Sequence, residues 1–317
     1  MKPILALLAL LAIVPLTAAQ TRNDPFDFKL ALSDHKGLLT WHADGFKIIQ
    51  ASVKPQGQEI GFRGTGADGI EFLAFLFIDS DSTQLTGSIC MDHILNFEKQ
   101  RDSTIKNSKT WDTTNRNKQP VAMVSYVDGN RTLSYHLRGF IAVGDLCGDF
   151  EFYSPKAIDA EDPSLKSIFA TYSLDPDYVP QFKDAFQYAQ IFYSNDMFKD
   201  AAPVFELALQ KLEKDETPDL DKKTWRRVAT DNAGMAYGIS GNLAKARTIF
   251  EGAIKADPDY PVYYYNLACT DAEEGKLADA RKHLELAFER KANVLPGESL
   301  PNQIGRASCR ERVCELV

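Results

Sequence analysis

Basic residues are scarce relative to acidic ones in this sequence, and they form no continuous stripe. The 317 residues include 36 lysines and arginines against 44 aspartates and glutamates, for a net charge of −8. Proteins that bind nucleic acid concentrate positive charge on one face. The charge balance therefore argues against a nucleic-acid partner.

Long apolar runs are also lacking beyond the N-terminus. The run ILALLALLAIVPL at residues 4–16 is shorter than the roughly 20 residues that a membrane-spanning helix needs. It follows Lys2 and precedes the small residues TAA, which is the pattern of a secretory signal peptide. We expect residues 1–19 to be cleaved, and the bacterial protein to be periplasmic or secreted without stable membrane insertion. A membrane anchor is the alternative.

The motifs of several enzyme classes are missing. The sequence has no G-x-S-x-G, no H-E-x-x-H and no P-loop, and its five histidines are scattered. GTGADG at residues 64–69 precedes a strand pattern rather than a helix, so we interpret it as a turn and not as a phosphate-binding loop. We expect no enzymatic activity, no cofactor and no metal.

An enzyme remains the alternative hypothesis. Asp145, Asp149 and Glu151 lie close in sequence to His136, and carboxylates near a histidine are typical of acid–base or metal sites. A hydrolase-like site would require His136, Asp145 and Asp149 to converge in one pocket of the N-terminal domain.

Cysteine is rare, and only some of the five cysteines inform the fold. Cys90 and Cys147 lie in one domain of a protein that we expect to be exported, where two cysteines usually pair. We predict a structural disulfide between them. Two buried thiols and a redox pair are the alternatives.

The C-terminal tail is unlike the rest of the chain. Residues 304–313, IGRASCRERV, resemble a translated sequencing adapter. We therefore predict that residues 304–317 are foreign to the protein and that the natural chain continues differently beyond about Gln303.

Residues 20–175 have the pattern of an α+β domain built on an antiparallel sheet. Runs rich in Phe, Ile, Val and Tyr alternate with turn residues. We expect two helices at 86–100 and 163–172, the first with Ile89, His93, Ile94 and Phe97 on one face. The polar stretch 99–120 is predicted to be a long loop, or alternatively a contact arm that exposes Trp111. A hairpin is followed by the strand GDLCGDFEFYS at residues 144–154 and by the helix and strand LKSIFATYSLDP at residues 165–176. This order resembles the photosystem oxygen-evolving-complex subunit P family, at the level of fold.

The chain repeats itself from Phe182 onward. Residues 182–215, 227–260 and 261–294 form three units, and equivalent positions of the last two are 34 residues apart, as in Gly241 and Gly275 or Ala246 and Ala280. This pattern resembles the tetratricopeptide repeat, in which each unit is a pair of antiparallel helices. Asp271 and Ala292 depart from the pattern, which would place Tyr and Pro there. We expect an all-α array over 176–303.

The resemblance implies a function as well as a fold. Tetratricopeptide arrays bind peptides in a groove lined by the first helix of each unit. Asn232 and Asn266 occupy equivalent positions and suit the backbone of an extended peptide, whereas the carboxylate clamp of the family is missing because only Lys183 fits it. We predict a non-catalytic interaction or scaffold protein with a protein or peptide partner. The predicted groove residues are Phe186, Gln190, Tyr193, Asp231, Asn232, Met235, Val262, Tyr265 and Asn266.

Overall fold

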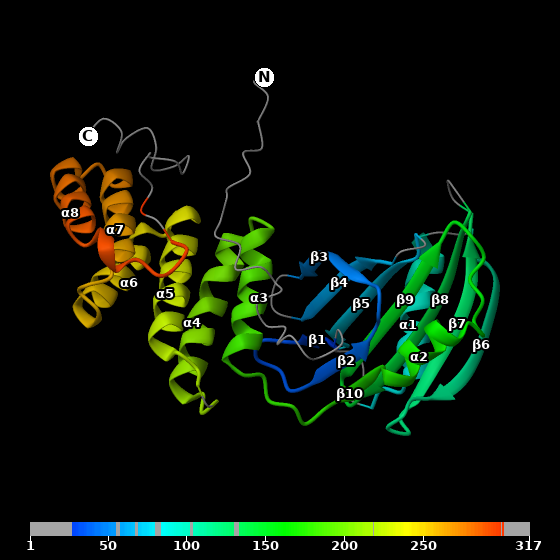
Figure 1. Ribbon diagram of the computed structural model, residues 1–317. Coiled ribbons are helices and arrows are strands. Elements are labelled where there is room, and N and C mark those ends of the chain that lie inside the picture. Colours follow the sequence, from blue (N-terminus) through cyan, green and yellow to red (C-terminus); the bar gives the residue numbers. More distant parts are fainter. Residues whose placement is uncertain are drawn as a thin grey trace, which may run out of the picture. The chain divides into compact units, whose positions relative to one another are not determined.

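The computed structural model in Figure 1 divides into two compact units. The sheet unit comprises residues 23–195, and the helical unit includes everything from residue 196 onward. The structure describes residues 27–54, 58–66, 69–79, 84–101, 104–129, 133–217, 219–298 and 300. The predicted signal peptide and the predicted foreign tail lie outside the described residues.

A seven-stranded antiparallel sheet forms the centre of the sheet unit, with the strand order β3-β4-β5-β9-β8-β7-β6. The predicted antiparallel sheet is confirmed, and the chain combines helices and strands as expected of an α+β protein. The strands are β3 (Lys47–Val53), β4 (Glu59–Thr65), β5 (Glu71–Ile78), β6 (Lys106–Thr114), β7 (Pro120–Asp128), β8 (Ser134–Val143) and β9 (Leu146–Ser154).

A second, three-stranded sheet and a helix bury an aromatic core in this unit. The sheet consists of β1 (Asp27–Ala31), β2 (Leu38–His42) and β10 (Ser173–Asp175), and the helix is α2 (Pro163–Thr171). Side chains alternate along a strand, so β9 directs Phe150 and Phe152 into this core. Phe150 stacks there on Phe72 of β5. Edge-to-face contacts join Phe150 to Trp41 of β2, and both phenylalanines to Phe169 of α2.

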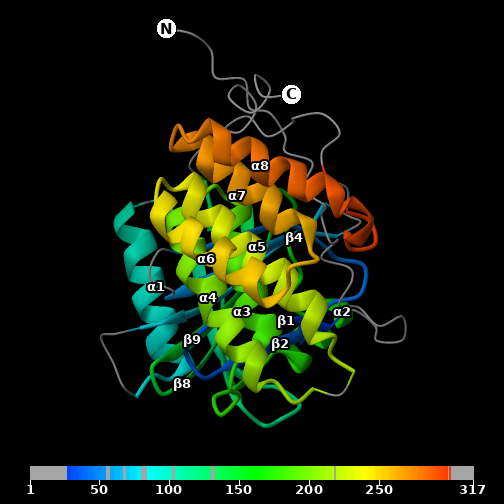
Figure 2. The same ribbon diagram turned by 90° about the vertical axis from the view of Figure 1, so that its left-hand side faces the viewer.

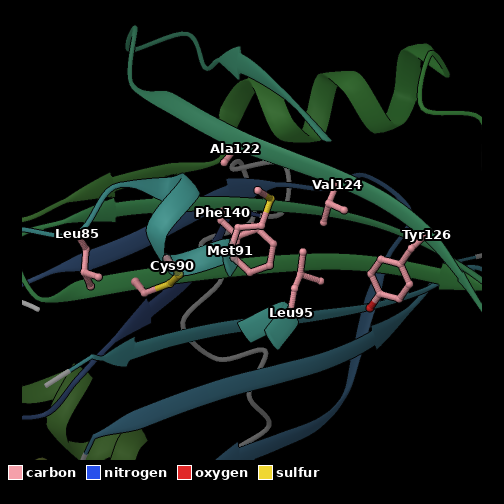
Figure 3. Packing of buried hydrophobic residues seen from close by; sticks show 9 residues of the cluster. Leu85, Cys90, Met91, Leu95, Ala122, Val124, Tyr126 and Phe140 are labelled. Carbon is pink, nitrogen blue, oxygen red and sulfur yellow. A yellow bond between two sulfur atoms is a disulfide. The ribbon is translucent and has the colours of Figure 1, made fainter. Parts of the chain in front are cut away.

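Helix α1 (Gly87–Arg101) packs with residues of β7 and β8 in a separate apolar cluster. Figure 3 shows Cys90, Met91 and Leu95 of α1 in this cluster. The helix is confirmed, but the predicted face is not the buried one: Ile89 is 38% exposed and Phe97 56% exposed, and His93 is exposed as well. The buried residues of α1 are Cys90, Met91 and Leu95.

The predicted disulfide is present in the structure. Cys90 on α1 is bonded to Cys147 on β9, with Cα atoms 6.2 Å apart and a sequence separation of 57 residues. It covalently joins the helix to the central strand of the sheet.

The prediction of a long loop over 99–120 is wrong. Residues Lys106–Thr114 form β6, which pairs antiparallel with β7 at the edge of the sheet. All nine of its residues are exposed, so no alternation of apolar and polar side chains marks the strand in the sequence. Trp111 is an exposed residue of this edge strand.

Helix α3 (Phe182–Ser194) belongs to the sheet unit, since the division falls between Asn195 and Asp196. The hydroxyl of Tyr188 donates to the backbone carbonyl of Glu59 at 2.8 Å, and Asn195 Nδ2 donates to the carbonyl of Ala51 at 3.4 Å. The division therefore runs through the first predicted repeat, 182–215.

The helical unit consists of antiparallel helices joined by short turns (Figure 2). Residues 216–226, which separate the first two predicted units, lie partly within a helix, because α5 begins at Lys222. Among the described residues no helix is long and apolar enough to cross a bilayer. The helices are α4 (Phe198–Lys214), α5 (Lys222–Ile239), α6 (Leu243–Ala256), α7 (Pro261–Glu273), α8 (Leu277–Glu289) and the short 3-10 helix η3 (Lys291–Asn293).

The last two predicted repeats correspond in sequence to the helix pairs α5–α6 and α7–α8. Gly241 and Gly275, 34 positions apart, each end a first helix with a positive φ, of 88° and 77°. L-residues with a side chain rarely adopt this conformation, so glycine at both positions keeps the two turns alike.

Candidate peptide-binding face of the repeats

The structure places the predicted groove residues on three helices. Phe186, Gln190 and Tyr193 lie on α3, in the sheet unit. The other six lie in the helical unit, three on α5 and three on α7: Asp231, Asn232, Met235, Val262, Tyr265 and Asn266. Helices α5 and α7 are in contact, so these six residues are the part of the predicted groove that one unit contains.

A polar contact joins the two helices at this face. Asn266 Nδ2 donates to Asp231 Oδ1, and the Asn266 side chain is only 3% exposed. A buried amide needs a hydrogen-bond partner, and here the neighbouring repeat supplies it. Asn266, predicted to hold a peptide backbone, therefore also holds α7 against α5.

The apolar members of the face pack on an aromatic cluster. Met235 and Val262 are half-buried against the rings of Phe250, Tyr260 and Tyr263. Tyr265 is 4% exposed and lies in the adjoining cluster of α7 and α8. Asp231, Asn232, Met235 and Val262 are half-buried and remain partly accessible, whereas Tyr265 and Asn266 are buried. The accessible part of the face thus combines apolar side chains with a carboxylate and an amide, which is the composition of many ligand sites.

Ion pairs between the helices hold the array together, and the sequence pattern did not indicate them. Asp271 on α7 pairs with Arg247 of α6 at 2.5 Å and with His283 of α8 at 2.6 Å. Arg247 also pairs with Glu274 at 2.6 Å. Asp271 is fully buried, so these partners compensate its charge inside the array.

The three residues of the enzyme hypothesis do not meet in one place. Asp145 lies in the turn between β8 and β9 and pairs with His35 at 3.2 Å. His136 lies near the other end of β8, nine residues earlier, which corresponds to a distance on the order of 20 Å along a strand. Asp149 lies between them along β9.

A buried charged network surrounds Arg138 instead. Arg138 binds Asp149 through Nη2 and Oδ2 at 2.5 Å, and it binds both oxygens of Glu98 at 2.7 and 2.8 Å. His136 Nδ1 contacts Glu151 Oε1 at 2.6 Å, and the ring stacks on Tyr126 with centroids 4.5 Å apart. Strands β7, β8 and β9 and helix α1 each contribute to this network.

The network perturbs the pKa values of its carboxyl groups in opposite directions. Burial raises the pKa of Asp149 to about 6 despite the attraction of Arg138. Burial also acts on Glu151, but the charge of Arg138 and the bond from His136 outweigh it and lower the pKa of Glu151. Perturbed pKa values occur in structural networks as well as in active sites, and this network ties α1 to the sheet.

A pocket of about 280 Å³ lies elsewhere in the sheet unit, and no sequence motif indicates it. His42 in its wall pairs with Asp44 at 3.3 Å. The hydroxyl of Ser164, which also lines it, donates to Asp162 at 2.5 Å and so serves the N-terminus of α2. The other lining residues are Gly45, Phe46, Gly66, Ile70, Leu165, Ser167 and Ile168. In the part of the chain that the structure describes, no cluster of three metal-ligating side chains is found.

Comparisons with solved structures return proteins with helical repeats. The type III secretion translocator chaperone SycD of Yersinia enterocolitica is 21% identical, with a TM-score of 0.30 over 35% of this chain and 76% of that chain. The C-terminal TPR-containing domain of a putative FK506-binding protein of Plasmodium falciparum is 17% identical, with a TM-score of 0.29 over 36% and 78%. TM-scores this low do not establish a shared fold by themselves.

A further solved structure, from Bacteroides thetaiotaomicron, covers more of the chain. It is 10% identical, with a TM-score of 0.29 over 63% of this chain and 78% of that one. No curated protein matches the chain.

The family model described as "Tetratricopeptide repeat" matches residues 231–260, the span of the second half of α5 and all of α6, so the chain contains a tetratricopeptide repeat there.

Proposed function

We propose that this chain is a non-catalytic, exported interaction or scaffold protein whose repeats bind a peptide or protein partner. The observation that carries the proposal is the Asp231–Asn266 contact between two successive helix pairs, one of which includes the matched repeat. Because this contact joins α5 to α7, it supports the assignment of their predicted groove positions to one binding face. Repeat arrays use such stacked faces as binding surfaces.

Two further features support export and the absence of nucleic acid. Disulfides such as Cys90–Cys147 persist in oxidising compartments and are rare in the cytosol. The acidic charge balance of the chain disfavours a phosphate backbone as partner. Cell fractionation of the full-length protein tests this location, with recovery in the periplasm or medium as the expected result.

Partner capture with matched variants tests the binding proposal. Full-length wild-type protein and Ala246→Leu, which overpacks the crossing of α5 and α6, are used as baits. We expect the variant to lose helical signal and native partners together. If it loses the helical signal but retains every partner, binding belongs to the sheet unit and the proposal fails.

A further inference from the structure

The segment that follows α8 folds back along the α6–α7 connection. Asn293 Nδ2 donates to the carbonyl of Asp259 at 3.2 Å, and Arg290 Nε donates to the carbonyl of Pro258 at 3.1 Å. These two hydrogen bonds hold the end of α8 and η3 against the α6–α7 connection. The segment continues from there, and the structure describes its residues 294–298 and 300.

The segment begins with a tight turn over Leu295-Pro296-Gly297-Glu298. The N–H of Glu298 donates to the carbonyl of Leu295 at 2.9 Å, and the N–H of Leu295 donates to Glu298 Oε2 at 3.1 Å. Gly297 has a φ of 85°, as the third position of a type II turn requires, and proline is favoured at the second. The turn therefore holds the side chains of Leu295 and Glu298 near each other.

Both ends of the turn contact residues beside the predicted groove. The hydroxyl of Tyr260 donates to the carboxylate oxygens of Glu298 at 2.8 and 3.0 Å. Burial, Asp231 and Glu298 all raise the pKa of Tyr260, so Asp231 and Glu298 act on the same hydroxyl. Leu295 packs against the cluster that contains Tyr260 and Tyr263, on which Met235 and Val262 also pack.

The segment then covers a second part of the face. Leu300 is 6% exposed and shares one apolar cluster with Tyr265 and Ala268 of α7, to which Val262 and Val294 add partly buried surface. The segment thus contributes Leu295 to the cluster shared by α5, α6 and α7, and Leu300 to the cluster of α7 and α8; Val262 of the predicted groove borders both clusters.

We propose that residues 295–298 and Leu300 are a built-in ligand of the groove and that the partner presents the same chemistry. The partner peptide would carry a Pro-Gly turn with a leucine-sized group before it, a carboxylate after it, and a second leucine two residues later. The partner displaces the segment to bind. The inference rests on the proposed function, since it requires the repeats to bind a peptide.

A tethered segment competes well even where its own contacts are weak, because its effective concentration is in the millimolar range for short flexible connections. A free peptide must therefore outcompete a weak but always present neighbour.

Fluorescence anisotropy with a labelled peptide of residues 294–300, VLPGESL, tests the inference on the full-length chain. The wild type should bind this peptide weakly. The double variant Leu295→Ser/Glu298→Gln should bind it about tenfold or more tightly, because its own segment no longer competes. Adding Tyr260→Phe to the double variant should weaken binding again, and Glu289→Gln, an exposed change at the end of α8, should behave as wild type.

A second variant guards against a folding defect in the first. Gly297→Ala strains the turn, while a Cβ at that position meets nothing within 4 Å, so it loosens the segment without touching the groove. It should also tighten peptide binding. Equal affinity of the wild type and both variants, or no binding to variants with intact helical signal, would overturn the inference. The capture experiment with Ala246→Leu tests the proposed function independently of the peptide-binding measurements. The proposed function and this inference can therefore fail separately.

Discussion

Asp271 on α7 links two neighbouring helix pairs through one buried carboxylate. Its Oδ1 accepts from Arg247 of α6 at 2.5 Å, and its Oδ2 contacts His283 Nδ1 of α8 at 2.6 Å. The repeat pattern would place tyrosine at this position. An ion pair thus stands where the pattern expects an aromatic contact, and it connects α6, α7 and α8.

Replacing this carboxylate should loosen the array. Asp271→Leu removes the partner of His283 and one of the partners of Arg247, while Glu274 continues to pair with Arg247. We expect a loss of about 1–3 kcal/mol in the free energy of unfolding, measured by urea denaturation. Glu251→Ala removes an exposed partner of the same Arg247 at 3.4 Å and should change it by less than about 0.5 kcal/mol. Equal effects of the two variants would contradict this account.

Ala246 lies where α5 and α6 cross closely. It is fully buried, and a Cβ built at Gly238 would lie 3.7 Å from its own Cβ. Ala246→Leu should overpack the crossing and cost on the order of 1–3 kcal/mol. Because contacts in repeat arrays are local, the helical unit should unfold at lower denaturant while the sheet unit keeps its transition. Ala244→Leu, exposed on the same helix, is the control, and a comparable loss from it would refute the crossing argument.

The disulfide should stabilise the sheet unit. For a loop of 57 residues the chain-entropy estimate is roughly 4 kcal/mol at most. Cys90→Ala/Cys147→Ala should therefore lower the melting temperature of the sheet unit. Mass measurement of the peptides that contain Cys90 and Cys147, with a thiol label applied before and after reduction, should show label on both cysteines only after reduction. Label on both cysteines in the unreduced sample would be the contrary result.

Arg138 should be required for the stability of the sheet unit, because its partners Asp149 and Glu151 are buried with it. Arg138→Met leaves Asp149 and Glu151 without their cation, and breaking a buried pair in this way costs about 3–5 kcal/mol. Arg116→Met, exposed on the surface, should cost less than about 0.5 kcal/mol.

The pH dependence of the same variant distinguishes a charge effect from a packing effect. The pKa of Asp149 in the folded protein, about 6, lies above its ordinary value, so the folded state binds the proton more tightly and ionisation of Asp149 lowers stability as the pH rises through this window. Without Arg138 that pKa should rise further. The deficit of Arg138→Met should accordingly be smaller at pH 5 than at pH 7 in denaturation experiments. A deficit independent of pH would mean that lost packing dominates.

Local patterns in the sequence were sufficient for much of the architecture. Strand runs rich in aromatic and β-branched residues predicted the antiparallel sheet, and the 34-residue spacing of Gly241 and Gly275 predicted the helix pairs α5–α6 and α7–α8. The disulfide between Cys90 and Cys147 was also predicted. These features depend on short-range periodicity, turn chemistry and residue type, which a single chain displays directly.

Other features depended on partners distant in sequence. The edge strand β6 carries no alternation because neither of its faces is buried. The buried face of α1 is determined by the sheet and by Cys147, not by the periodicity of the helix alone.

The charged contacts could not be predicted from the sequence either. Glu98 and Arg138 are 40 residues apart, and Tyr260 and Glu298 are 38 apart. Whether a charged side chain faces water or a buried partner depends on what the tertiary fold places beside it. The repeats and the sheet were therefore determined by the sequence itself, whereas the Arg138 network and the segment over the groove were decided only by the tertiary structure, because burial in the fold makes an opposite charge or a hydrogen-bond donor necessary.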